Sequence, residues 1–166
     1  MVGWAIYDFV ISSDSAQVEE SEDDIEVGLE VGNRAPDFEL PTLEGGEVKL
    51  SDLRGERVMI NFWASWCAPC RAEIPDMQEF YEDTDIQILA VNLTQTEDNY
   101  DNVPKFVKNY GMEFPILMDE ENSASTTYQI QPIPTSFMID SEGIIRYKAM
   151  GAMNYDLMVQ EYEKMD

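Results

Sequence analysis

Residues 58–70 read VMINFWASWCAPC and hold both cysteines of the 166-residue chain. The apolar run that opens this stretch is typical of a buried central strand. The segment after it has helical spacing and begins near Pro69, a residue that suits the first turn of a helix. The stretch therefore predicts a strand, a turn and a helix, with the pair Cys67-x-x-Cys70 at the turn.

The cysteine pair has the spacing of a site for thiol–disulfide exchange. A thiolate attacks a disulfide, and the positive end of a helix favours a thiolate over a thiol. Cys67 precedes the helix, so we expect it to be the nucleophile, with a pKa below the ordinary value of about 8.5. Cys70 lies one turn inside and is expected to resolve the mixed disulfide. An inert structural bond is disfavoured, because a bond between such near neighbours closes almost no loop.

Resolution by Cys70 needs a proton acceptor, and the chain contains no histidine. Glu73 lies three residues after Cys70, one turn further along the expected helix. Burial would raise the pKa of this carboxyl toward neutral pH, whereas on a solvated face it would be an ordinary glutamate. The residues alone leave both interpretations open.

Composition excludes several classes of function. The net charge of −24, from 34 acidic and 10 basic residues, argues against nucleic acid as a partner. The lack of histidine removes Ser-His-Asp and Cys-His catalysis and most zinc and copper sites. Two cysteines cannot build a four-ligand metal site, which leaves only a metal that bridges two chains. We expect no metal, and no cofactor beyond a redox-active Cys67–Cys70 disulfide.

The first 30 residues differ from the rest of the chain. Residues 1–11 are mostly apolar, but they are too short to cross a bilayer and follow no basic segment. We interpret them as the remnant of a signal-anchor; an apolar strand or an interfacial segment is the alternative. Residues 12–30 are rich in serine and acids, and are expected to form a disordered tether. Residues 31–166 form the expected domain.

The first half of that domain predicts a parallel unit. Apolar runs at residues 57–64 and 86–91 read as buried strands on either side of a helix at about residues 69–82. The helical spacing predicts a buried stripe made of Cys70, Ile74, Met77 and Tyr81.

The second half predicts antiparallel strands. Residues 135–140 and 144–149 flank a turn with glycine and read as a hairpin. The result is an α/β fold, a mixed central sheet with helices on both faces and extra N-terminal strands. The other expected elements are an edge strand at 35–40, a turn at 44–47 followed by residues 48–50, a short helical turn at 51–55, a helix at 103–110, a short extended piece at 114–118, a weak helix at 122–129 and a last helix at 157–165.

Taken together, these motifs resemble the thioredoxin superfamily, and within it the extracytoplasmic TlpA/ResA-like thiol–disulfide oxidoreductases. The resemblance covers residues 31–166 and implies a thioredoxin-like fold. It rests on Asn61–Cys70, Pro75, Ile133-Pro134-Thr135, Gly32-x-x-Ala35-Pro36-Asp37-Phe38, Leu50-Ser51-Asp52-Leu53-Arg54-Gly55 and Phe137-x-Ile139-Asp140-x-x-Gly143.

The resemblance implies roles that the residues alone do not decide. X-Pro bonds in folded proteins are cis only about 5–6% of the time, so residue types alone disfavour a cis Ile133–Pro134 bond. The resemblance, in contrast, implies that Pro134 is a cis-proline facing the disulfide and that Ile133 offers its backbone to an extended substrate. It also matches Glu73 to a glutamate that tunes the cysteines. The expected substrate-contacting residues are Trp66, Ala68, Pro69, Ile133 and Pro134.

One position departs from cytoplasmic thioredoxins, which carry a buried aspartate where this chain has Asn61. An asparagine cannot accept a proton, so the acid–base role falls to Glu73, to water, or to no single residue.

The resemblance also implies a setting. Such proteins are commonly tethered outside the cytoplasmic membrane and draw electrons from a membrane thiol–disulfide carrier. They reduce disulfides in extracytoplasmic proteins, such as apocytochrome c or envelope and spore proteins. Two alternatives remain. A peroxiredoxin-like peroxide reductase would share the entry at residues 35–38 but needs a Pro-x-x-x-Thr/Ser-x-x-Cys signature that residues 61–67 lack. A non-enzymatic metal or thiol chaperone is the other, although copper carriers of similar fold need a histidine.

Overall fold

The computed structural model describes residues 24–166, so the expected anchor remnant and residues 12–23 of the expected tether lie outside the described residues. Residues 26–30 already pair with the domain. Arg34 N–H donates to the Glu26 carbonyl at 2.9 Å, and Gly28 N–H donates to the Arg34 carbonyl at 3.1 Å. The folded chain therefore begins before the predicted boundary at residue 31. The Glu26 and Glu30 side chains are exposed, and only the backbone of this segment is paired. The acidic composition therefore could not predict that residues 26–30 are ordered.

A five-stranded mixed sheet forms the centre, in the order β5-β4-β3-β6-β7. β3 pairs in parallel with β4, and β4 with β5, whereas β3–β6 and β6–β7 are antiparallel. The predicted βαβ unit and the predicted hairpin are both confirmed. The strands are β3 (Val58–Trp63), β4 (Gln87–Asn92), β5 (Ile116–Met118), β6 (Thr135–Ile139) and β7 (Ile145–Met150).

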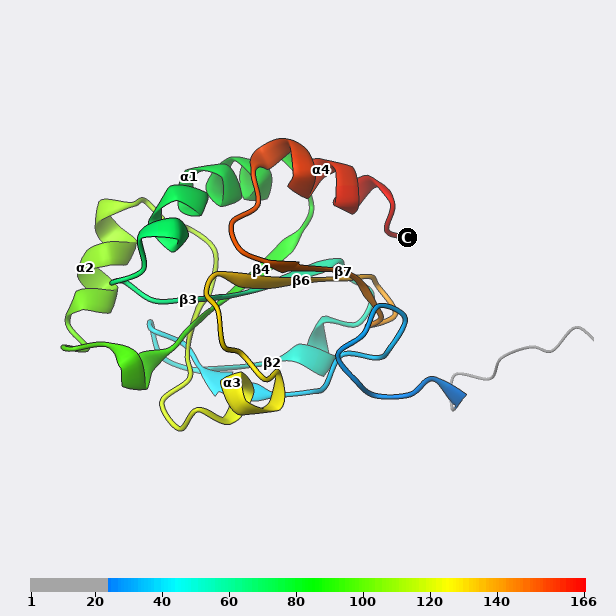
Figure 1. The fold of residues 1–166 in the computed structure, drawn as a ribbon, viewed down its shortest axis with the longest axis horizontal. Helices are drawn as coiled ribbons and strands as arrows, with labels where there is room; N and C mark the ends of the chain where they lie inside the picture. The colour runs from blue at the N-terminus through cyan, green and yellow to red at the C-terminus, as the bar shows by residue number, and fades with distance from the viewer. Residues whose placement is uncertain (1–23) are drawn as a thin grey trace, which may run out of the picture.

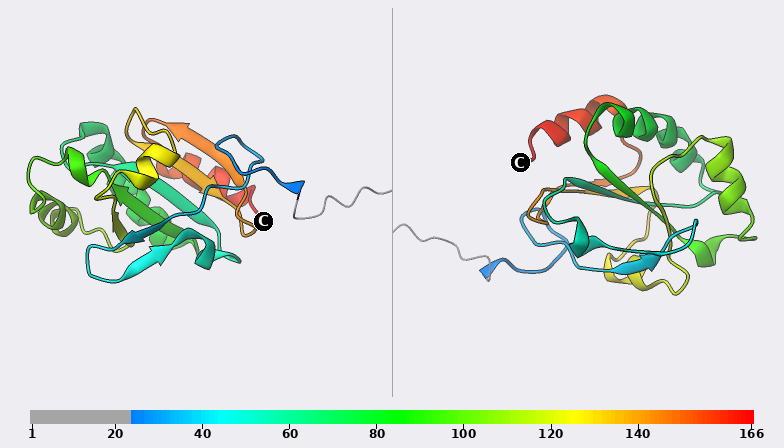
Figure 2. Two further views of the ribbon diagram at one scale, coloured as in Figure 1. Left: turned by 90° about the horizontal axis from the view of Figure 1, so that it is seen from below. Right: turned by 180° about the vertical axis from the view of Figure 1, so that it is seen from behind.

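Helices cover both faces of the sheet, as predicted (Figure 1). α1 (Ala68–Asp83), α2 (Asn102–Asn109) and α4 (Tyr155–Glu163) contribute to one apolar core. The opposite core is closed by α3 (Ser123–Thr127), by the short helix η2 (Leu50–Leu53) and by the antiparallel pair β1 (Glu39–Pro41) and β2 (Glu47–Lys49). In the right-hand view of Figure 2, β1, β2 and α3 lie on one side of the sheet, and α1 and α4 lie on the other.

Side-chain alternation along β3 decides what lies beneath the cysteines. Met59 and Trp63 belong to the core under α1, and Ile60 and Phe62 belong to the opposite core. All four are fully buried, and each such side chain stabilises the fold by about 1.5–3 kcal/mol. Asn61 lies between them and, by the same alternation, points to the α1 side. A polar side chain therefore lies between β3 and α1.

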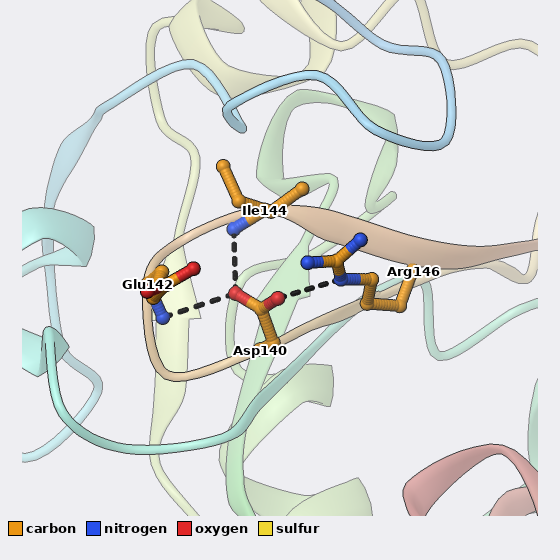
Figure 3. Close-up of polar contacts among 4 residues, drawn as sticks. All are labelled: Asp140, Glu142, Ile144 and Arg146. Carbon is orange, nitrogen blue, oxygen red and sulfur yellow. Dashed lines mark hydrogen bonds and ion pairs between the residues drawn. The ribbon is translucent and has the colours of Figure 1, made fainter. Parts of the chain in front are cut away.

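Asp140 fixes the turn between β6 and β7 (Figure 3). Its Oδ1 accepts hydrogen bonds from the backbone N–H groups of Glu142 and Ile144, both at 3.0 Å. Its Oδ2 lies 2.6 Å from Arg146 Nε. The pairing that starts at this turn shifts register between Ile139 and Met138, and it ends with Thr135 opposite Met150.

Just beyond that end of the hairpin, Gly151 N–H donates to the Pro134 carbonyl at 2.8 Å. The segment after β7 therefore holds the loop before β6 in place. No helix within residues 24–166 combines the length and the apolar character needed to cross a membrane.

Candidate active site

The two cysteines lie at the start of α1. Cys67 is the N-cap residue, Cys70 lies in the first turn, and their Sγ atoms form a disulfide with Cα atoms 5.3 Å apart. The Cys70 N–H donates to Cys67 Sγ at 3.2 Å. The first N–H groups of a helix have no partner within the helix, and here one of them points at the first sulfur. The same N–H and the helix dipole favour a thiolate at Cys67 once the disulfide is reduced.

Both sulfur-bearing residues are buried, and the exposed surface belongs to their neighbours. Cys67 is 3% exposed and Cys70 is 1% exposed, so exposure alone does not distinguish the two expected roles. Trp66 is 53% exposed, and Ala68 and Pro69 are also exposed. A substrate would therefore reach Cys67 across the rim formed by Trp66, Ala68 and Pro69.

The loop before β6 forms the other side of the site. The Ile133–Pro134 bond is cis, as the resemblance implies and residue types alone did not predict. The Ile133 carbonyl oxygen lies 3.7 Å from Cys67 Sγ. Thr135 Oγ donates to the Pro132 carbonyl at 2.7 Å and braces the loop. The structure thus brings Ile133 and Pro134 to the first cysteine although more than 60 residues separate them in the sequence.

Glu73 lies on the buried face of α1 and not on its solvated face. It is 1% exposed, and its Oε1 accepts a hydrogen bond from Asn61 Nδ2 at 3.0 Å. Its Oε2 accepts from the Met153 N–H at 3.0 Å. Burial raises the pKa of Glu73 to about 7, and it outweighs the lowering by the Met153 N–H and the Ser136 hydroxyl; the charge of Asp76 adds to the rise. Near neutral pH this carboxyl can both hold and release a proton.

Two residues that sequence reasoning missed hold the turn before Cys67. Glu97, 7% exposed, accepts from Ser65 N–H at 2.7 Å and from Asn92 Nδ2 at 2.9 Å through Oε1. Its Oε2 accepts a hydrogen bond from the Ser65 hydroxyl. Thr96 Oγ accepts from Trp66 Nε1 at 3.0 Å. The surrounding polar stretch has no apolar periodicity, so no local signal marked either residue.

Ser136 was also missed. It is fully buried on β6, and its Oγ accepts a hydrogen bond from Asn61 Nδ2 at 2.9 Å. Its position among apolar strand residues could have marked it as a buried hydroxyl in need of a partner. Among residues 24–166, no group of three or more His, Cys, Asp or Glu side chains is arranged to hold a metal ion.

Known proteins resemble this chain in sequence and in fold. Residues 31–148 match the model of the AhpC/TSA family. The thiol–disulfide oxidoreductase ResA of Geobacillus thermodenitrificans (strain NG80-2) is 39% identical over 138 residues, which cover 81% of this chain and 78% of that protein. The thioredoxin-like protein YneN of Bacillus subtilis (strain 168) is 36% identical over 140 residues, covering 83% and 82%. The crystal structure of StoA from Bacillus subtilis aligns with a TM-score of 0.69 at 31% identity, covering 76% of this chain and 96% of StoA.

Because this relative is a thiol–disulfide oxidoreductase, the comparison favours disulfide exchange over peroxide reduction and over a chaperone role. The resemblance drawn from the motifs is confirmed, as are the thioredoxin-like fold and the oxidoreductase activity. The chain belongs to the AhpC/TSA family, as a thioredoxin-like thiol–disulfide oxidoreductase similar to ResA.

Proposed function

We propose that this oxidoreductase works as a reductase of disulfides in proteins outside the cytoplasm. Cys67 is the nucleophile, Cys70 is the resolving thiol and Glu73 is the proton acceptor. The observation that carries the proposal is the placement of a buried carboxyl one turn beyond the disulfide, with a pKa of about 7 caused mainly by burial. A group that changes protonation near neutral pH can take the proton that Cys70 must lose.

The reaction balances with the residues at the site. The Cys67 thiolate attacks one sulfur of the substrate disulfide, and the other substrate sulfur leaves as a thiolate. The Cys70 thiol gives its proton to the Glu73 carboxylate and attacks Cys67 Sγ. The substrate sulfur that was bound to Cys67 leaves as a thiolate, and the Cys67–Cys70 disulfide forms. Two electrons pass to the substrate, and a dithiol donor must return them; a membrane thiol–disulfide carrier is the donor we propose.

The rim around Cys67 suits an extended polypeptide. The Ile133 carbonyl lies beside the sulfur and can accept a hydrogen bond from the backbone of a bound strand. Trp66, Ala68 and Pro69 offer an exposed, uncharged surface next to Cys67, and Pro134 is buried beside Ile133. The three rim residues carry no charge, so they select substrates by neither sign, whereas the net charge of −24 disfavours strongly acidic substrates.

The location and the partners rest on the resemblance and on the N-terminal sequence. We propose that residues 1–11 belong to an anchor on the outer face of the cytoplasmic membrane and that the acidic stretch after them acts as a tether. The proposed substrates are disulfide-bonded extracytoplasmic proteins, either apocytochrome c or proteins of the envelope or spore. The similarity to ResA supports this assignment.

Trapping in the native cells tests the proposal. A Cys70→Ala variant cannot resolve its mixed disulfide, so it should accumulate substrates bound to Cys67, identifiable by mass spectrometry. Cys67→Ala is the matched control and should capture nothing. The reduction potential tests the direction: we expect a value nearer to thioredoxin's, about −270 mV, than to that of the oxidant DsbA, about −120 mV. A potential at the DsbA end, or captured proteins that are all cytoplasmic, would contradict the proposal.

A further inference from the structure

Two neutral residues on adjacent strands meet beneath Glu73. Asn61 on β3 and Ser136 on β6 are register partners across the antiparallel pair. Both are buried, with exposed fractions of 1% and 0%. Asn61 Nδ2 donates to Glu73 Oε1 at 3.0 Å and to Ser136 Oγ at 2.9 Å, so both hydrogens of the amide are used. The strands thus present a fixed donor to the carboxyl above them.

Ser136 extends the same network. Its oxygen accepts from Asn61, which leaves the hydroxyl hydrogen free to donate, and the hydroxyl is hydrogen-bonded to the Glu73 carboxylate. The Met153 N–H holds the other carboxylate oxygen at 3.0 Å. Three donors from three segments therefore surround the carboxylate, and all three are neutral. No lysine or arginine of residues 24–166 forms an ion pair with Glu73.

The Asn61 amide is oriented toward Glu73 at a cost. Its Oδ1 is buried and has no partner among the described residues. A buried carbonyl oxygen without a donor is unfavourable. The opposite orientation would give that oxygen the Ser136 hydroxyl, but it would then place an acceptor against the Glu73 carboxylate. The unpaired oxygen is thus the consequence of aiming the amide N–H at Glu73.

We propose that Asn61 and Ser136 are positioning residues that hold the Glu73 carboxylate and set its affinity for a proton. Hydrogen bonds donated to a carboxylate stabilise the charged form, whereas burial and nearby negative charge stabilise the neutral form. Among residues 24–166, the charge that acts on Glu73 is that of Asp76, three residues further along the same helix. The Asp76 Oδ2 accepts a hydrogen bond from the Tyr155 N–H at the start of α4 at 3.3 Å. The inference rests on the proposed function only in assuming that Glu73 receives its proton from Cys70.

The test is a titration of the Glu73 carboxyl by carbon-13 NMR in the oxidised full-length chain, where the cysteines do not titrate. Asn61→Ala removes a charge-assisted hydrogen bond, so we expect the Glu73 pKa to rise by about one unit, a tenfold change in proton affinity. Ser136→Ala should raise it by less. Ser136→Thr keeps a hydroxyl and should restore the wild-type titration.

Asn92→Ala is the matched control. Asn92 is also a buried strand asparagine with an unpaired Oδ1, but it donates to Glu97. Its loss should leave the Glu73 titration unchanged. The same Glu73 pKa in wild type, Asn61→Ala and Ser136→Ala would overturn the inference. If Asn61→Ala does not fold, the Ser136→Ala and Ser136→Thr pair decides alone.

A second readout separates this inference from the proposed function. The rate at which Cys70 resolves a mixed disulfide is measured against pH in the same variants. If the Glu73 pKa rises and the rate profile does not follow, Asn61 and Ser136 do control the carboxyl, and the proton-acceptor role of Glu73 fails. If Glu73→Gln slows resolution but neither strand variant moves the Glu73 titration, the proposed function stands and this inference fails.

Discussion

Glu73 and Met153 are joined by a hydrogen bond of 3.0 Å from the Met153 N–H to Glu73 Oε2. The bond links the cysteine helix to the segment between β7 and α4, 80 residues later in the chain. Because the donor is a backbone group, its position depends on how that segment packs. The carboxyl that we propose as the proton acceptor is thus placed by tertiary structure.

The stability of the oxidised protein should depend on the protonation of Glu73. The folded-state pKa of about 7 lies above the ordinary value of 4.5, so the folded state binds this proton more tightly than the unfolded state does. Glu73 therefore stabilises the fold fully below pH 4.5, and that contribution is lost as the pH rises toward 7. The loss amounts to about 3 kcal/mol.

Glu73→Gln should remove that loss. We expect the difference in free energy of unfolding, variant minus wild type, to be larger at pH 8 than at pH 5. Urea unfolding of the oxidised proteins at both pH values measures it. Glu79→Gln is the control, since Glu79 lies exposed on the same helix. Equal pH dependence in wild type and Glu73→Gln would show that Glu73 binds no extra proton in the folded state.

Exchange kinetics should also report on Glu73. Without a carboxylate to receive the Cys70 proton, Glu73→Gln should slow resolution of the mixed disulfide by up to about 100-fold. The rise in rate near pH 7 should disappear as well. Stopped-flow reduction of a model protein disulfide between pH 5 and pH 9 gives the profile. An unaltered profile would leave water as the proton acceptor.

Loss of Glu97 should loosen the turn before Cys67. Glu97→Ala leaves the Ser65 N–H and the Asn92 amide without their acceptor in a buried place. We expect the free energy of unfolding to fall by about 2–3 kcal/mol. Thr96→Val is the comparison. It removes the partner of the exposed Trp66 ring N–H, which water can replace, and the hydroxyl that donates to the Leu93 carbonyl. That carbonyl keeps the Thr96 N–H at 2.9 Å, so the change should stay under about 1 kcal/mol. Urea unfolding of both variants decides, and equal losses would refute the role of Glu97.

The hairpin turn should depend on Asp140 and not on its exposed neighbour. Asp140→Ala leaves the Glu142 and Ile144 N–H groups unpaired and breaks the contact with Arg146. We expect the free energy of unfolding to fall by about 2–4 kcal/mol. Glu142→Ala should cost little, because only its backbone takes part. Thermal unfolding compares the two, and similar losses would count against Asp140 as the anchor of the turn.

The elements that sequence reasoning placed correctly are those with a local signal. The strand before Cys67 and the helix after it follow from an apolar run and from helical spacing. The hairpin follows from its two apolar runs and the turn with Gly143. In each case the hydrophobic pattern and the turn chemistry are contained in a short stretch of the chain.

The parts of the site that were missed depend on segments far apart in sequence. The predicted stripe on the cysteine helix included Tyr81, but the structure buries Glu73 and Phe80 and leaves Tyr81 only partly covered. The position of Glu73 is decided by Asn61 and Met153, and helical spacing alone says nothing of either. The cis bond at Pro134 came from family resemblance, since residue types made it improbable.

The short connection between β7 and α4 contacts both the loop before β6 and the buried Glu73 carboxyl. Gly151 N–H holds the Pro134 carbonyl at 2.8 Å, and two residues later Met153 N–H holds Glu73. Any shift of this connection would move the substrate-facing loop and the buried acid together. A change in the length of this connection would therefore alter both the loop proposed to contact the substrate and the protonation of Glu73.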